Sequence, residues 1–234
     1  MKNKFFFKKF AISAFGCGMP VSTDGILLGS WAYQKNTGTI LDIGSGTGLL
    51  SLMMAQRFEQ AQITAIDIDA KAVLATSNNV ADSAWKNRIN VFHSDIVEWQ
   101  KGAQKYDLII CNPPYFNHGE QAKDAHRATA RHTDSLSHNA LIRALKQLLN
   151  EHGSAHLILP TYEAEQFMQK AEMYQLYCAR KLKVRTTAQK PVSRILFSLA
   201  HEKFECKQDD LTIHTEQNYS QDFIALTKDF YLKM

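Results

Sequence analysis

Residues 41–48 have the sequence LDIGSGTG, in which Gly44, Gly46 and Gly48 separate an apolar run from the apolar segment LLSLMMAQRF. The run before the glycines predicts a buried strand, and the segment after them predicts a helix. Glycine tolerates a positive φ and lets a ligand approach the backbone closely. This order therefore predicts a strand–turn–helix unit whose turn can cradle a ligand, although a plain tight turn would need the same glycines.

The spacing of the glycines argues against a dinucleotide-binding turn. The G-x-G-x-x-G pattern of such turns would place its third glycine at position 49, which is Leu49 in this chain. Asp42 lies just before the glycines, where its carboxylate can orient the turn or accept a hydrogen bond from a cationic ligand.

Strands and helices alternate along the chain, which predicts a mostly parallel sheet covered on both faces. A short helix is predicted at residues 23–33, capped by Thr23 or Asp24, and a longer one runs from residue 135 to Gly153. Ligands of such sheets bind beyond the carboxyl ends of the strands. The predicted strands lie in TILDI, QITAIDID, INVFHSDI, YDLII and SAHLILP, and a closing hairpin lies in LYCARKLKVR and SRILFSLA.

The composition fits one globular α/β domain. The chain has 234 residues, of which 45% are hydrophobic, and 27 Lys and Arg face 23 Asp and Glu, which permits an anionic partner such as RNA. The four cysteines are far apart and the nine histidines fit no metal motif, so we expect neither a disulfide framework nor a metal. No apolar run reaches the roughly 20 residues of a membrane span. We therefore expect a cytoplasmic protein.

Two further carboxylates follow predicted strands. Asp67 can accept hydrogen bonds from both hydroxyls of a ribose, and Asp95 could accept one from an adenine amine that Ile96 covers. Each acid alone could be a helix cap or a solvated turn. Together with the glycine turn they end three successive strands at one edge of the sheet, which predicts a nucleoside site.

Taken in order, LDIGSGTG, AIDID, HSDI and CNPPY resemble the motifs of S-adenosylmethionine-dependent methyltransferases with a Rossmann-like fold, over about residues 20–200. The resemblance implies an α/β fold: a seven-stranded, mostly parallel sheet with flanking helices and an antiparallel closing strand. It also implies S-adenosylmethionine as the cofactor. The candidate cofactor-binding residues are Thr23, Asp42, Gly44, Ser45, Gly46, Gly48, Asp67, Ile68, Asp95 and Ile96.

The sequence CNPPY at residues 111–115 must end its strand, because proline has no N–H for the ladder. Such a turn resembles that of enzymes that methylate exocyclic or side-chain amide nitrogens. The Asn112 side-chain oxygen and the Pro113 carbonyl would accept the two hydrogens of a planar amine, and Tyr115 would stack on the base. The candidate catalytic residues are Asn112, Pro113, Pro114 and Tyr115; the alternative is a strand-ending turn with an incidental asparagine.

Three further segments narrow the resemblance. CGMPVSTDGILLGSWA, ARHT at 130–133 and the terminal QNYSQDFIALTKDFYLKM resemble the family of bacterial tRNA1(Val) (adenine-37-N6)-methyltransferases. This implies N6-methylation of an adenine in tRNA, with adenine 37 in the anticodon loop of tRNA-Val as the target. The chain departs from the family at Pro20 and Ser22, where a lysine and a glycine are usual, so it lacks any RNA contact that this lysine would make.

Other functions stay open at this point. Related turns occur in enzymes that methylate guanine N2 of ribosomal RNA or a protein glutamine, and a non-catalytic RNA-binding subunit could keep the fold. The glutamine enzymes carry a helical domain before the glycine turn, for which the roughly forty preceding residues leave little room. A non-catalytic subunit would be expected to lose the glycines or Asn112, and this chain has them all.

Basic residues suggest where RNA could bind. Lys4, Lys8 and Lys9 lie among phenylalanines in an N-terminal arm of about residues 1–20, which could also be an edge strand. Arg127 and Arg131 lie in the polar segment 116–139, which could cover the target base or be a solvated loop.

We expect one domain over residues 1–234, acting as a monomer or weak dimer. The final residues, about 205–234, are predicted to form a helical extension that packs on the domain through Tyr219, Phe223, Leu226 and Phe230.

Overall fold

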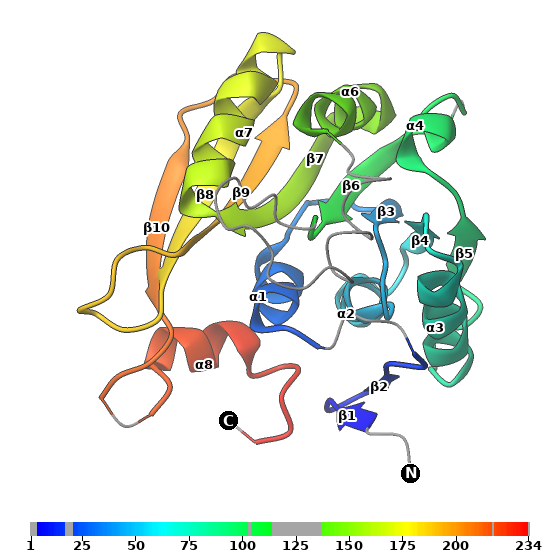
Figure 1. Ribbon diagram of the computed structural model, residues 1–234, viewed down its shortest axis with the longest axis horizontal. Coiled ribbons are helices and arrows are strands. Elements are labelled where there is room, and N and C mark those ends of the chain that lie inside the picture. The colour runs from blue at the N-terminus through cyan, green and yellow to red at the C-terminus, as the bar shows by residue number, and fades with distance from the viewer. Residues whose placement is uncertain (1–3, 17–20, 103, 114–136, 217, 234) are drawn as a thin grey trace, which may run out of the picture.

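The computed structural model describes residues 4–16, 21–102, 104–113, 137–216 and 218–233, and Figure 1 shows its elements. The strands are β1 (Lys4–Phe6), β2 (Ala11–Ser13), β3 (Thr39–Ile43), β4 (Gln62–Asp67), β5 (Ile89–His93), β6 (Tyr106–Cys111), β7 (Leu149–Pro160), β8 (Tyr177–Arg185), β9 (Arg194–Ala200) and β10 (Lys207–Thr212). The helices are α1 (Thr23–Trp31), α2 (Leu49–Arg57), α3 (Ala70–Ala81), α4 (Ile96–Trp99), α6 (His138–Leu148), α7 (Thr161–Met173) and α8 (Gln221–Thr227).

An eight-stranded sheet runs through the centre of the molecule in the order β10-β8-β9-β7-β6-β3-β4-β5. From β7 to β5 in this order, each pair of neighbouring strands is parallel. β9 pairs antiparallel with both β7 and β8. The mostly parallel sheet and the closing hairpin are therefore confirmed, and the carboxyl ends of β3, β4, β5 and β6 meet at one edge.

Helices cover both faces of this sheet. In Figure 1, α1, α2 and α3 lie on one side, and α4, α6 and α7 lie on the other. Because successive side chains of a strand point to opposite faces, each central strand contributes side chains to the apolar clusters on both faces of the sheet. Ile40 and Leu108 belong to the apolar cluster shared with α1 and α2, whereas Leu41 and Ile109 belong to the cluster shared with α6 and α7. Within the described part of the chain, no helix is both long and apolar enough to cross a membrane.

Strand β10 makes eight strands where seven were predicted, and it lies in the segment predicted as a helical extension. It pairs in parallel with β8, with Lys207 opposite Arg180. Its sequence KQDDLT buries only Leu211. A strand held mainly by backbone pairing has almost no hydrophobic periodicity, and for that reason the sequence does not reveal it. Among the described residues of this segment, α8, which follows β10, is the only helix. Helix α7, between β7 and β8, is likewise not predicted.

The first helix begins at Thr23, as predicted, and ends at Trp31, but its cap lies one residue earlier than predicted. Ser22, rather than Thr23 or Asp24, is the N-cap of α1, and its Oγ accepts a hydrogen bond from the Gly25 N–H at 3.1 Å. Serine is among the preferred N-cap residues because its hydroxyl oxygen satisfies a free N–H of the first turn. One of the two departures from the family pattern thus has a local structural role.

Gly153 does not end a helix, because α6 stops at Leu148 and β7 starts with the next residue. Gly153 lies inside β7, where a Cβ would be 2.8 Å from the Tyr106 carbonyl oxygen and 3.0 Å from that of Asp107. Both neighbours are backbone atoms and cannot swing away. The close approach of β6, and not a helix end, requires this glycine.

The N-terminal arm folds back on the helical layer and meets the C-terminus. β1 and β2 form an antiparallel hairpin, and the rings of Phe7 and Phe10 stack at a centroid distance of 4.6 Å, both buried. Phe7 forms a β-bridge with Tyr231, and the Lys8 N–H donates to the Phe230 carbonyl. The two chain ends therefore lie side by side, beyond α1, α2 and α3 from the sheet (Figure 1).

Candidate active site

The glycine turn joins β3 to α2 at the carboxyl edge of the sheet. Gly44, Gly46 and Gly48 have φ values of 72°, 58° and 81°, a left-handed conformation that glycine adopts without steric cost. A Cβ at Gly44 would meet no atom within 4 Å, so the backbone there borders open space. A ligand could approach the backbone at this point.

Asp67, at the end of β4, stabilises this turn through a hydrogen bond. Its Oδ2 accepts from the Gly46 N–H at 2.8 Å, and its Oδ1 accepts from the Asp69 N–H at 2.9 Å. The side chain is partly exposed, and each carboxylate oxygen can accept more than one hydrogen bond. Both oxygens keep capacity for ribose hydroxyls. The bond to Gly46 is a structural role that the sequence analysis missed.

Asp42 is fully buried next to the turn. Its Oδ2 accepts from the Ser51 hydroxyl at 2.6 Å, whereas its Oδ1 has no hydrogen-bond partner within the described ranges. Burial raises the pKa of Asp42 to about 7; the Ser51 hydrogen bond opposes the rise and the Asp67 charge adds to it. A buried polar atom without a partner costs free energy. A proton or a ligand donor would satisfy Oδ1, which is an observation that fits a bound group at this edge.

Asp95 caps a helix, which was the alternative to a ligand contact in the sequence analysis. It is the N-cap of α4, and its Oδ1 accepts from the Val97 N–H at 2.7 Å. Because Asp67 lies opposite His93 in the β4–β5 pair, Asp95 still follows the neighbouring strand end. Ile96 is buried, and Ile68 is 47% exposed, which leaves an apolar side chain at the same edge.

Asn112 and Pro113 follow β6 directly beside the glycine turn. Cys111, the last residue of β6, is paired with Ile43, the last residue of β3. Asn112 is half-buried and Pro113 is buried. Pro114 and Tyr115 lie outside the described residues.

Cys111 precedes this turn but is unsuited to nucleophilic chemistry. Burial, together with the charges of Asp42 and Asp67, raises the pKa of its thiol far above the ordinary value. Because the thiolate is the reactive form, this cysteine is a core residue.

Two contacts that the sequence analysis missed hold the site together. The Thr76 hydroxyl on α3 donates to the Gly46 carbonyl at 3.0 Å and lies 3.1 Å from the Ser45 Oγ. The Asp24 carboxylate forms an ion pair with Arg194 at 2.9 Å, which ties the start of α1 to β9. The sequence offered one signal for the first contact, which is that Thr76 lies on the buried face of α3. Thr23 is exposed at the start of α1.

The basic residues of the arm lie apart from this edge. Lys4 pairs with Asp82 at 3.3 Å, and the Lys8 Nζ donates to the Lys228 carbonyl at 2.6 Å. Lys9 makes no hydrogen bond or ion pair with a described residue. Arg127 and Arg131 lie outside the described residues. Among the residues that are described, no three His, Cys, Asp or Glu side chains are placed to hold a metal.

Comparison with known proteins identifies the family. The family model described as the methyltransferase small domain matches residues 24–175. A Vibrio cholerae protein named tRNA1(Val) (adenine(37)-N6)-methyltransferase is 51% identical over 234 residues, covering 100% of this chain and 97% of its own. A Vibrio campbellii protein of the same name is 47% identical, with coverage of 98% and 96%.

The chain belongs to the tRNA1(Val) (adenine(37)-N6)-methyltransferase family. The predicted family and enzyme class are confirmed by this membership.

Solved structures support the methyltransferase fold. A protein from Agrobacterium tumefaciens described as a predicted O-methyltransferase has a TM-score of 0.70 at 16% identity, covering 88% of this chain and 96% of its own. A glycopeptide N-methyltransferase complexed with S-adenosylmethionine has a TM-score of 0.56 at 11% identity, with coverage of 78% and 100%. At these identities the likeness concerns the fold alone, and it agrees with the predicted Rossmann-like class.

Proposed function

We propose that this chain transfers the methyl group of S-adenosylmethionine to N6 of an adenine in tRNA, with adenine 37 of tRNA1(Val) as the target. Full-length relatives with 51% and 47% identity carry this name. The observation that carries the chemistry is the Asn112-Pro113 turn, which follows β6 at the strand end paired with the glycine turn. Guanine or glutamine methylation and a non-catalytic role are less well supported, because the relatives share the whole length of the chain.

The residues at the edge of the sheet would hold the cofactor as a nucleoside. Asp67 would accept from the ribose hydroxyls, and the open backbone at Gly44 would let the ligand approach. Asp95 keeps one carboxylate oxygen besides the one that caps α4, and Ile68 and Ile96 offer apolar surface to an adenine ring. When bound, S-adenosylmethionine supplies an electrophilic methyl group on its sulfonium.

The Asn112-Pro113 turn would make the adenine N6 amine a better nucleophile. The adenine N6 lone pair is delocalised into the ring, so the amine is a poor nucleophile. If the Asn112 side-chain oxygen and the Pro113 carbonyl accept its two hydrogens, the nitrogen can pyramidalise and direct its lone pair away from the ring. These fixed acceptors also stabilise the positive charge that develops on nitrogen. Tyr115 would stack on the extruded base. We extend the proposal to a metal-free reaction of a monomer or weak dimer in the cytoplasm.

Asn112→Ala is the direct test. Loss of one preorganised acceptor should lower turnover by about 10²–10³-fold, while the cofactor Kd measured by calorimetry should stay within about threefold, because Asn112 lies outside the glycine turn. The assay is methyl transfer to tRNA from cells lacking the protein, followed by nucleoside analysis of the product.

Asn90→Ala is the matched control, since Asn90 is an exposed asparagine on β5, an edge strand of the same sheet. It should leave both turnover and cofactor affinity unchanged. A product other than N6-methyladenosine would overturn the assigned substrate, and full activity of Asn112→Ala would overturn the role of the turn.

A further inference from the structure

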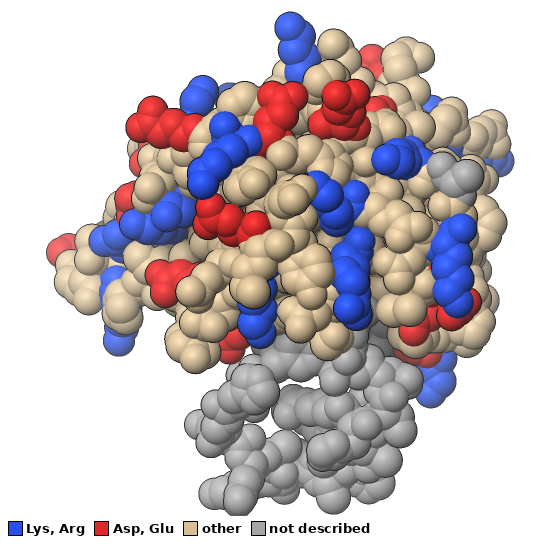
Figure 2. Space-filling model, turned by 90° about the horizontal axis from the view of Figure 1, so that it is seen from above, with Lys and Arg blue, Asp and Glu red and all other residues tan. Residues whose placement is uncertain are grey.

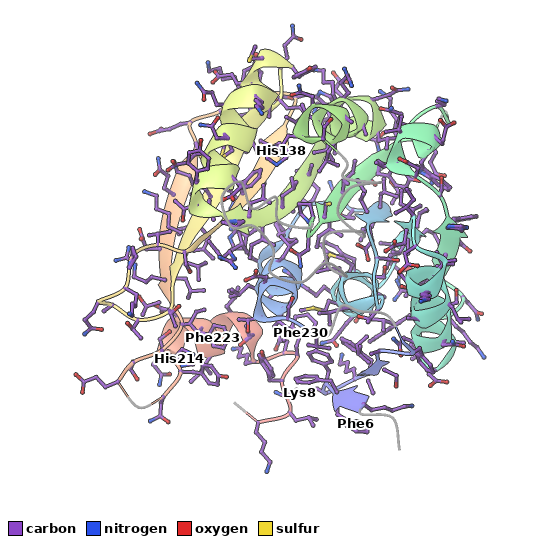
Figure 3. The ribbon with its side chains drawn as sticks, in the orientation of Figure 1. Phe6, Lys8, His138, His214, Phe223 and Phe230 are labelled. Atoms are coloured by element: carbon purple, nitrogen blue, oxygen red, sulfur yellow. The ribbon has the colours of Figure 1, made fainter. Side chains whose placement is uncertain are left out.

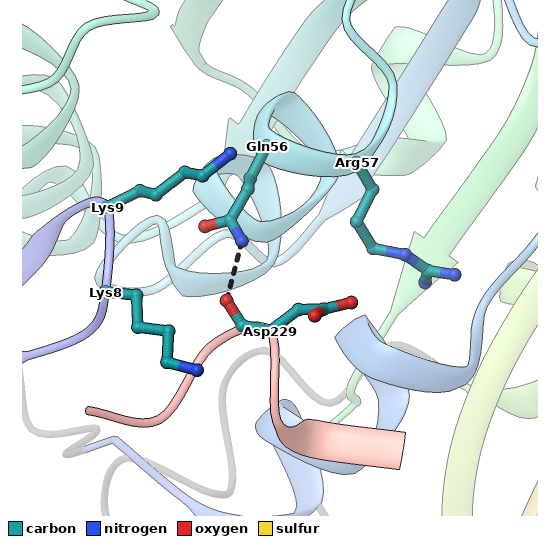
Figure 4. A pocket seen from close by; sticks show the side chains of 5 residues that line it. All are labelled: Lys8, Lys9, Gln56, Arg57 and Asp229. Carbon is teal, nitrogen blue, oxygen red and sulfur yellow. Dashed lines mark hydrogen bonds between the residues drawn. The ribbon is translucent and has the colours of Figure 1, made fainter. Parts of the chain in front are cut away.

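A polar pocket of about 420 Å³ lies where the two chain ends meet helix α2, away from the catalytic edge. Lys8, Lys9, Gln56, Arg57 and Asp229 line it, and Figure 4 shows the three cationic side chains around one carboxylate. An excess of positive charge in a concave site attracts an anion. No residue of this pocket belongs to the candidate active site.

The sequence FKKF at residues 7–10 builds one wall. The Phe7 N–H donates to the Phe10 carbonyl at 2.8 Å, and both rings are buried, so the chain turns tightly with two lysines at its tip. The Lys8 Nζ is committed to the Lys228 carbonyl at the end of α8, where a cation is favourable. Lys9 has no such partner within the described ranges, and its ammonium is available to a ligand.

Helix α2 and the C-terminal segment build the other walls. Arg57 donates through Nη1 to the Gly29 carbonyl at 2.8 Å, which fixes the guanidinium at the end of α1. Gln56 donates to the Asp229 backbone carbonyl at 2.9 Å (Figure 4). The pocket is therefore held by contacts to backbone carbonyls, and Lys9 is the lining cation that makes no hydrogen bond or ion pair with a described residue.

Aromatic rings lie on the two chain-end segments that carry Lys8, Lys9 and Asp229. Phe6 on β1 is 59% exposed and Phe5 is 40% exposed, and the Phe5 ring lies 6.4 Å from that of Tyr231. The aromatic array continues from Tyr231 to Phe223, and Tyr219 stacks on Phe223 at 4.8 Å. Figure 3 shows Lys8 between the labels of Phe6 and Phe230, and Phe223 on helix α8. Exposed rings next to cations are typical of surfaces on which nucleotides stack.

We propose that this chain-end pocket binds a backbone phosphate of the RNA substrate, with Lys9 as its main free cation and the exposed rings of Phe5 and Phe6 as flanking contacts. The proposal rests on the proposed tRNA substrate. The face over α4, α6 and α7 has a different character, because Figure 2 shows lysines and arginines interleaved with acids there. Lys101 pairs with Glu98, and Lys203 pairs with Glu172, so these cations are already neutralised.

Lys9→Glu and Asp229→Asn test the pocket with opposite expected signs. Lys9→Glu should weaken tRNA binding by roughly three- to tenfold, because one phosphate contact is lost. The salt slope, which is the fall of log affinity with log salt concentration, should decrease by about one. Asp229→Asn should strengthen binding, since it removes the single carboxylate while its backbone carbonyl still accepts from Gln56. Lys170→Glu on α7 is the matched control and should change neither quantity.

Several outcomes would overturn the proposal. One is a salt slope for Lys9→Glu equal to that of Lys170→Glu. Another comes from a binding assay with poly-glutamate. If poly-glutamate binds the wild type but not Lys9→Glu, and tRNA does not compete with it, the pocket would bind an acidic protein partner instead. Competition by inorganic phosphate as strong as that by tRNA would indicate a free-anion site. A separate outcome would refute the proposed function and support the pocket: absence of tRNA methylation by the wild type together with a salt dependence of tRNA binding that Lys9→Glu lowers.

Discussion

At the scale of single residues, two carboxylates beside one glycine turn have different roles because their surroundings differ. Asp67 is partly exposed and accepts two backbone N–H groups, which suits a charged side chain that meets a ligand. Asp42 is fully buried with one oxygen unpaired. Their positions in the sequence alone would suggest similar functions.

We predict that Asp67→Asn weakens S-adenosylmethionine binding. The amide oxygen can still accept one hydrogen bond, so the turn should persist, but the charge that favours the ribose hydroxyls is lost. Charge-assisted hydrogen bonds contribute about 1.5–3 kcal/mol, so affinity should fall at least tenfold by calorimetry. Asp69→Asn is the control, because asparagine is an equally good N-cap for α3. Equal affinities for the two variants would contradict the ribose contact.

We predict a pH-dependent stability from Asp42. Its pKa is about 7 in the folded protein against 3.8 without burial, so the folded state holds a proton that the unfolded chain releases. The stability from this proton is complete below pH 3.8 and is lost as pH rises towards 7. Between pH 5 and 8 the stability of the wild type should fall by roughly 2–3 kcal/mol relative to Asp42→Asn. Urea unfolding at several pH values measures this, and parallel profiles for the two proteins would refute it.

At the scale of elements, strand β10 brings together two cysteines that are far apart in the sequence. The Sγ atoms of Cys178 on β8 and Cys206 just before β10 lie 3.0 Å apart as free thiols. The sequence analysis expected no disulfide framework, and the proximity of these two thiols could not be read from the sequence. Burial raises the pKa of the Cys178 thiol, so few molecules hold the reactive thiolate at neutral pH.

We predict that hydrogen peroxide slowly joins Cys178 and Cys206. The two thiols lose two hydrogens, and the peroxide is reduced to two water molecules. The reaction should accelerate as pH rises, and closing a loop of this length should stabilise the fold by about 3–4 kcal/mol. Mass spectrometry of peptides checks the bond, with Cys178→Ser as the control. Absence of the bond after prolonged oxidation at high pH would show that the strand pair holds the thiols apart.

At the scale of the whole molecule, the N-terminal arm and the C-terminal segment close against the same helical layer. Phe7, Phe10, Phe223 and Phe230 join the apolar cluster of α1 and α2. The phenylalanines of the arm are therefore divided: Phe7 and Phe10 are core residues, whereas Phe5 and Phe6 are exposed.

We predict that Phe230→Ala loosens both chain ends together. Phe230 is 1% exposed, and truncation of such a ring typically costs about 3–5 kcal/mol. Hydrogen exchange should speed up in β1 and β2 as well as around Phe230, because the Lys8 N–H donates to the Phe230 carbonyl. Leu232→Ala, at a 57% exposed position, should be nearly neutral. Faster exchange confined to the C-terminus would show that the two ends are not coupled.

The sequence by itself determined the features that depend on local chemistry. The glycines of LDIGSGTG need a left-handed backbone, and all three adopt it. The apolar runs before the turns predict strands buried on both faces, and β3, β4 and β6 are such strands. Parallel strands place their carboxyl ends together, so the shared edge of Gly44, Asp67, Asp95 and Asn112 follows from their order.

Only the tertiary structure decided the features that depend on distant partners. β10 exists because β8 offers an edge for backbone pairing, which leaves no apolar pattern in KQDDLT. Gly153 is required by the backbone of β6, and the charge state of Asp42 is set by complete burial. The chain-end pocket combines residues 8 and 229 from opposite ends of the sequence. Periodicity and propensity report what a residue prefers locally, whereas burial and charge pairing depend on which segments the fold brings together.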